Sequence, residues 1–156
     1  MNERNETDAE RYDRNWIELI QELRVAQTGV QVLAGFLLTL PFSSRFGDID
    51  SRHRTIYLVA FSLAVITVGL MTAPASLHRF LFGRHEKKTL VRVGAFFAKA
   101  GLASMGLTLV VVVVLIFGVV VDDTAGYIAG AATLVFFLLA WVVLPLVVLN
   151  QKTGSS

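Results

Sequence analysis

Residues 100–121 read AGLASMGLTLVVVVVLIFGVVV, a run of 22 residues without a charged side chain. At the rise of an α-helix, about 20 residues cross the roughly 30 Å hydrocarbon core of a bilayer. The five valines at 110–114 would favour a strand in water, but in lipid an open strand edge leaves backbone groups unsatisfied. The run therefore predicts a membrane-spanning helix, which we place at about 92–121.

Three more apolar stretches predict helices at about 16–42, 55–78 and 125–149, separated by short polar segments. Asp50 or Ser51 can cap the second of these, and the Asp122-Asp123-Thr124 turn can cap the last. We expect an all-α polytopic membrane protein with its four transmembrane helices in one bundle.

The two ends of the chain are polar. Residues 1–15 are rich in charge and poor in apolar side chains, so we predict a disordered cytoplasmic tail there. Residues 150–156 form a short polar C-terminal tail. The first apolar run starts too late and is too long for a signal peptide, so we expect it to stay in the membrane.

Composition supports a membrane protein, since 54% of the residues are apolar and only 17% are charged. The net charge of +2 comes from residues at the ends of apolar runs, without an aromatic-interleaved basic stripe, so we expect no nucleic-acid partner. The absence of cysteine excludes disulfides, thiol catalysis and thiolate metal ligands.

Lysine and arginine counts predict the orientation. The N-terminal stretch through Arg24, the loop through Arg92 and the C-terminal tail carry ten of them, whereas the loop at 43–54 carries three and the turn at 122–124 none. Because basic loops stay in the cytoplasm, we expect both termini to be cytoplasmic in a multi-pass protein of the cell membrane.

The first helix carries polar residues into its apolar part. Arg24, Gln27 and Gln31, here called the polar face, are spaced i, i+3 and i+7 and so share one side of a helix. An amide near the bilayer centre needs a partner, so this face should point into the bundle or at another protein. Together with Glu22 and Lys99 it forms a candidate polar seam, whose charged members either snorkel to head groups or pair as ions.

The loop at 79–92 is the most basic segment. Its candidate contacts to anionic lipid head groups are His78, Arg79, Arg84, Lys87 and Lys88. The alternative interpretation is that these residues only orient the protein in the membrane. Two histidines seven residues apart with few carboxylates are a poor metal site, and we expect no bound metal.

Gly126 and Gly130 form a GxxxG pattern in the last helix. Small residues let helix backbones approach closely, so this pattern indicates either packing within the bundle or a homodimer. No GxSxG, Walker A, HExxH or Rossmann glycine pattern is present, so we expect neither enzymatic activity nor a cofactor.

The segment Glu18–Gln31, ELIQELRVAQTGVQ, is followed by Pro41-Phe42, Ala73-Pro74 and His78-Arg79. In these motifs the chain resembles, over about residues 15–120, a family of uncharacterised small actinobacterial four-helix membrane proteins. Members are sometimes labelled sodium:proton antiporters. The resemblance implies an actinobacterial source and the inner membrane.

We expect a non-enzymatic accessory or partner-binding membrane subunit, organised by the polar seam, whose partner is another membrane protein or a second copy. The alternative is a small proton or sodium carrier in which Glu22 titrates beside Lys99 or Arg24. Proton relays usually rest on carboxylates in the membrane centre, and no central apolar stretch here holds one. A third hypothesis is lipid head-group binding by the loop at 79–92.

Overall fold

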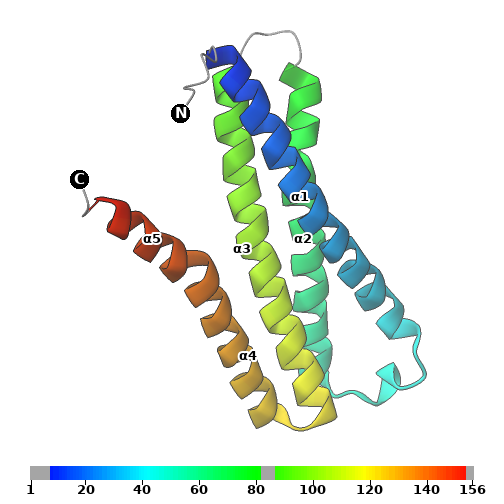
Figure 1. The fold of residues 1–156 in the computed structure, drawn as a ribbon. Coiled ribbons are helices and arrows are strands. Elements are labelled where there is room, and N and C mark those ends of the chain that lie inside the picture. The colour runs from blue at the N-terminus through cyan, green and yellow to red at the C-terminus, as the bar shows by residue number, and fades with distance from the viewer. Residues whose placement is uncertain (1–7, 82–86, 154–156) are drawn as a thin grey trace. The chain divides into compact units, whose positions relative to one another are not determined.

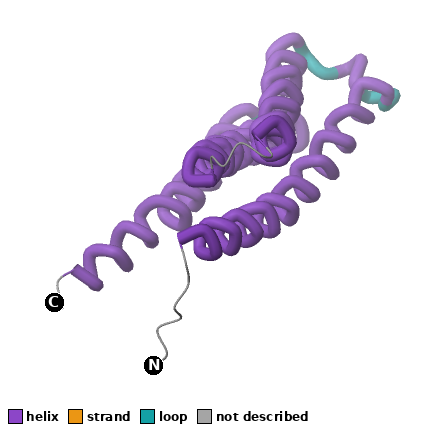
Figure 2. Tube along the Cα trace, turned by 90° about the horizontal axis from the view of Figure 1, so that it is seen from above, coloured by secondary structure: helices purple, strands orange, loops and turns teal. Residues whose placement is uncertain are grey.

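The computed structural model describes residues 8–81 and 87–153, and almost all of them are helical (Figures 1 and 2). Within these residues, four helical stretches are long and apolar enough to cross a membrane: Arg14–Phe42, Ser51–Leu77, Val91–Val120 and Asp123–Asn150. The predicted all-α class is confirmed. The elements are α1 (Asp8–Thr39), two 3₁₀ turns (Leu40–Phe42 and Phe46–Asp48), α2 (Ser51–Leu81), α3 (Lys87–Val120), α4 (Asp123–Leu138), a π-helical segment (Leu139–Val143) and α5 (Leu144–Thr153).

The prediction of a disordered tail over 1–15 is wrong for residues 8–15, which belong to α1. Charged residues one turn apart stabilise this extension, as Arg14 and Glu18 do with an ion pair of 3.8 Å between Nε and Oε1. Residues 1–7 lie outside the described part of the chain. At the other end, α5 continues to Thr153, so the polar tail predicted at 150–156 is helical over its first residues.

Two aspartates cap helices as predicted. The carboxylate of Asp50 accepts a hydrogen bond of 2.8 Å from the backbone N–H of His53, so α2 begins at Ser51 rather than at 55. Asp122 accepts a bond of 2.8 Å from the N–H of Ala125, and α4 begins at Asp123 rather than at 125. Each cap satisfies an N–H group that the helix itself leaves unpaired.

The chain divides into two compact units, and α2 and α3 run through both. The first unit comprises Met1–Thr39 and Leu63–Met105. Its core is formed by Leu23 and Val30 of α1 with Met71 of α2, flanked by Ala98 and Met105 of α3 among others. Thr67, fully buried, lies 2.7 Å from Ser104 between their hydroxyl oxygens and so links α2 to α3.

The second unit comprises Leu40–Ser62 and Gly106–Ser156. Here α4 approaches α3 through Gly126 and Gly130, both of which are buried. A Cβ atom on Gly126 would lie 2.8 Å from the carbonyl oxygen of Val114 and 3.0 Å from the backbone nitrogen of Gly118. Gly126 therefore lies against the backbone of α3 in the same chain, and Gly130 lies against the Val114 side chain of that helix.

The fourth apolar stretch is not the single α-helix predicted at 125–149. Its helix widens to a π-helical segment at Leu139–Val143, where the N–H of Leu144 donates to the carbonyl of Leu139. Pro145 follows directly. A proline lacks the N–H that an α-helix needs and its ring collides with the carbonyl four residues earlier, here that of Trp141, which accounts for a break at this point.

Candidate functional site

The polar face lies at the edge of the surface by which α1 packs. Leu23, Val30 and Leu37 are buried and mark the packed side of α1. Gln27 is half-buried beside this stripe, whereas Arg24 and Gln31 are exposed. Arg24 and Gln31 therefore lie outside the core that α1 shares with α2 and α3, whereas Gln27 lies at the edge of this core.

Glu22 and Lys99 are both exposed, and the contacts found among the described residues include no ion pair between them. The structure thus places the charged members of the polar seam on the protein surface, without bringing the candidate titrating group and its counter-charge together. This arrangement agrees with long side chains that reach for water at the membrane boundary.

Most of the predicted head-group contacts fall outside what the structure describes. Arg84 lies in the segment 82–86, which is outside the described residues. His78, Lys87 and Lys88 belong to helices, but their side chains are outside the described part. Arg79 is exposed near the end of α2. The hypothesis of head-group binding by this loop stays a prediction.

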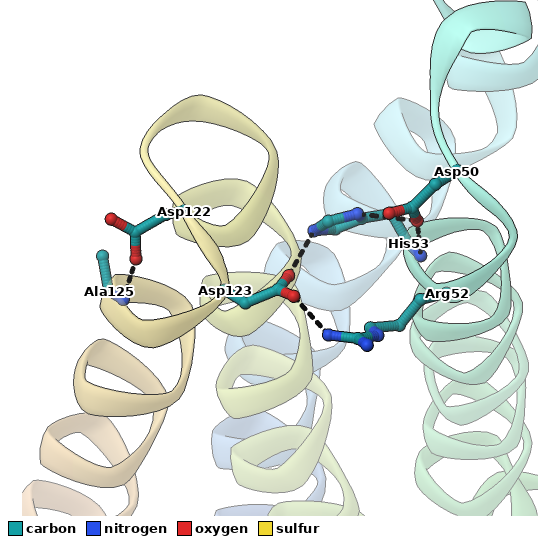
Figure 3. Close-up of polar contacts among 6 residues, drawn as sticks. All are labelled: Asp50, Arg52, His53, Asp122, Asp123 and Ala125. Carbon is teal, nitrogen blue, oxygen red and sulfur yellow. Dashed lines mark hydrogen bonds and ion pairs between the residues drawn. The ribbon is translucent and has the colours of Figure 1, made fainter.

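A cluster of charges in the second unit joins the start of α2 to the start of α4 (Figure 3). The Nδ1 atom of His53 lies 2.9 Å from Oδ1 of Asp50. Its Nε2 atom lies 3.3 Å from Oδ1 of Asp123, in an ion-pair contact without hydrogen-bond geometry. The guanidinium of Arg52 pairs with the other carboxylate oxygen of Asp123.

The His53 ring is held in place by its surroundings, since its side chain is only 12% exposed. A Cβ atom on Gly118 of α3 would lie 2.8 Å from Nε2, so only glycine leaves room for the imidazole. This packing fixes both ring nitrogens toward carboxylates that come from different helices. The cluster consequently holds α2 and α4 together at their N-terminal ends.

The contact with His53 also affects the neighbouring carboxyl group of Asp50. The hydrogen bond from the backbone N–H of His53 lowers the pKa of the Asp50 carboxyl below its usual 3.8.

What the cluster can do is pair charges between the starts of α2 and α4. Among the described residues, no three or more His, Cys, Asp or Glu side chains are placed to hold a metal ion together. The sequence indicated Asp50 and Asp122 only as caps and did not single out His53 or Arg52. Because Arg52 and Asp123 are 71 positions apart, no local spacing signals their contact.

Comparison with known families establishes which family the chain belongs to. A family model described as a family of unknown function (DUF6328) matches residues 5–145, so the chain belongs to this family. Comparisons with curated proteins and with solved structures gave no match.

Proposed function

Because family membership leaves the role of the chain open, we propose that it is a polytopic protein of the cell membrane that binds another membrane protein through the polar face of α1. Both termini lie in the cytoplasm, and the chain works without enzymatic chemistry as an accessory subunit. The observation that carries the proposal is the exposure of Gln31.

The membrane placement is supported by the four apolar helical stretches and by the lysine and arginine distribution. The loop between Phe42 and Ser51 and the turn between α3 and α4 fall on one side of such a topology. They carry few basic residues, whereas the other side carries ten. This asymmetry is typical of a protein whose basic side faces the cytoplasm.

Gln31 lies well inside its span, 17 residues after Arg14 and 11 before Phe42. Hydrocarbon offers no hydrogen bond, and an unpaired amide there costs free energy. No hydrogen bond of the Gln31 side chain occurs among the contacts of the described residues, and the residue is exposed. A second membrane protein with a polar group at the same depth would satisfy this amide.

The exposed side chains of α4 differ in kind from those of the polar face. Gly126 and Gly130 of α4 are buried, but most of the large apolar side chains of this helix are exposed. The side chains that it exposes, such as Ile128 and Phe136, are apolar. Lipid tails can surround these apolar side chains, so α4 needs no protein partner to cover them. Exposure alone therefore does not indicate a binding face, but exposed amide and guanidinium groups inside a span do.

The test is co-purification from the native membrane in a mild detergent, with a tag on the full chain. Gln31→Leu removes the amide and keeps the size of the side chain, and Gln21→Leu makes the same change at an exposed position near the membrane boundary. Interhelical hydrogen bonds of this kind contribute about 0.6–2 kcal/mol. We expect Gln31→Leu to lower partner recovery roughly threefold to thirtyfold, while Gln21→Leu retains it.

Two differently tagged copies of the chain distinguish the kinds of partner. If the copies recover each other in a manner that depends on Gln31, the partner is a second copy. If another membrane protein is recovered instead, the chain is an accessory subunit. Equal recovery with Gln31→Leu and Gln21→Leu would refute binding through the polar face.

A further inference from the structure

The second unit contains an apolar pocket of about 220 Å³ between the loop that follows α1 and the neighbouring parts of α2 and α3. Ten residues line it, and only Ser43, Arg45 and Tyr57 among them carry polar side-chain atoms. The wall from α3 consists of aliphatic side chains, including Ile116 and Val119. The pocket opens at the surface, and its mostly apolar walls suit a segment of an apolar chain.

The walls of the pocket are held in place by the fold of the loop. The N–H of Ser43 donates to the carbonyl of Leu40 at 3.0 Å, and that of Phe46 to Ser43 at 3.1 Å. The Phe46 ring then meets Tyr57 of α2 edge to face, with 5.0 Å between the ring centres. Tyr57 itself is only 4% exposed. The pocket is thus preformed and does not require a guest to take shape.

The position of the pocket in the chain places it at the boundary of the membrane. Its residues lie where the first apolar stretch ends at Phe42, where the second begins at Ser51 and where the third ends at Val120. In the proposed topology this is the side away from the cytoplasm. Lipid phosphates lie at this depth, with acyl chains directly beneath them.

Arg45 supplies a positive charge at this boundary. Its side chain is exposed, and no ion pair of Arg45 occurs among the contacts of the described residues. Its guanidinium can bind a phosphate through two parallel hydrogen bonds. An apolar cavity next to an available guanidinium is complementary to a molecule with an apolar chain and an anionic head.

We propose that this pocket binds one anionic phospholipid, with a segment of an acyl chain inside the cavity and the phosphate against Arg45. The proposal rests on the membrane placement given above but not on partner binding by α1. It concerns different residues from the basic loop at 79–92 and the opposite side of the membrane.

Native mass spectrometry of the detergent-purified full chain tests the proposal, with dioleoyl phosphatidylglycerol or dioleoyl phosphatidylcholine added in increasing amounts. We expect one phosphatidylglycerol to bind the wild type roughly three- to fivefold more tightly than phosphatidylcholine, as for one exposed charge pair. Arg45→Gln should abolish this preference. Arg54→Gln removes an exposed arginine from the same region outside the pocket and should preserve it.

A second pair of variants tests the apolar half of the site. Val119→Phe fills the pocket and should lower binding of both lipids at least threefold, whereas Ile128→Phe changes an exposed residue of α4 and should leave binding unaltered. Both positions are exposed, so neither variant should unfold the protein, and circular dichroism verifies this.

Three outcomes would overturn the proposal. Equal loss of preference in Arg45→Gln and Arg54→Gln would mean general charge attraction. Unchanged binding by folded Val119→Phe would mean that no chain enters the cavity. Displacement of the bound lipid by glycerophosphoglycerol, the same head group without acyl chains, would identify a head-group site outside the pocket. Because Gln31 is not involved, failure here leaves the partner-binding test unaffected.

Discussion

Gly126→Ala should weaken the contact between α4 and α3, although alanine is the better helix former. The added methyl group would lie 2.8 Å from the Val114 carbonyl oxygen, 3.0 Å from the Gly118 nitrogen and 3.2 Å from the Gly118 Cα. Nonbonded carbon atoms are most stable at about 3.5–4.0 Å. All three obstructing atoms belong to the backbone of α3, so no side chain can turn away and the helices must separate.

The expected magnitude follows from two opposing terms. Overpacking in a close contact costs about 1–3 kcal/mol, and replacing glycine by alanine inside a helix stabilises it by about 0.5–1 kcal/mol. The net loss of stability should be about 0.5–2 kcal/mol. In Gly130→Ala the nearest atom is a methyl carbon of Val114, whose branched side chain is stiff in a helix, so this variant should lose stability as well.

The assay is unfolding of the purified protein in mixed micelles with increasing dodecyl sulfate, followed by circular dichroism and tryptophan fluorescence. Trp141 reports on the α4 contact, since its ring lies against Gly106 of α3. Gly29→Ala is the matched control, because a Cβ atom there would meet nothing within 4 Å. If Gly126→Ala proves as stable as Gly29→Ala, α4 does not pack on α3 as described.

Three further variants test the polar contacts. Asp123→Asn breaks exposed ion pairs and should lower the unfolding free energy by less than about 1 kcal/mol, an effect that high salt removes. Asp50 stabilises the fold above its unfolded pKa near 3.8 and loses this contribution as pH falls through its lower folded value, so Asp50→Asn should flatten the stability profile measured from pH 5 to pH 2. Thr67→Val removes the contact to Ser104 and should cost about 0.6–1.7 kcal/mol in dodecyl sulfate unfolding, whereas a neutral effect would mean that the hydroxyls do not bond.

The apolar stretches could be predicted from the sequence because each is a long run without charge, and only a helix satisfies the backbone of such a run in lipid. The start of α1 could not be predicted in this way. Residues 8–15 carry no apolar pattern, and they continue a helix whose apolar part begins further along the chain, with support from contacts such as that of Arg14 and Glu18. Charge-rich composition there indicated disorder instead.

The candidate sites, too, could be predicted only in part from the sequence. The spacing of Arg24, Gln27 and Gln31 was sufficient to predict a shared face, but spacing does not tell whether a face points inward or outward. That depends on the packed stripe through Leu23 and Val30, which lies at a different angle around the helix. The His53 cluster could not be predicted from the sequence because Asp123, which contacts both Arg52 and His53, belongs to a helix far along the chain.

The π-helical segment also determines how the end of the chain is oriented. A π turn holds one residue more than an α turn, so every position after Val143 is rotated by about 100° from where an unbroken α-helix would carry it. The side on which Gly126 and Gly130 lie is therefore not continued by α5. The number of residues in this segment thus decides which residues of α5 lie on the same side as Gly126 and Gly130.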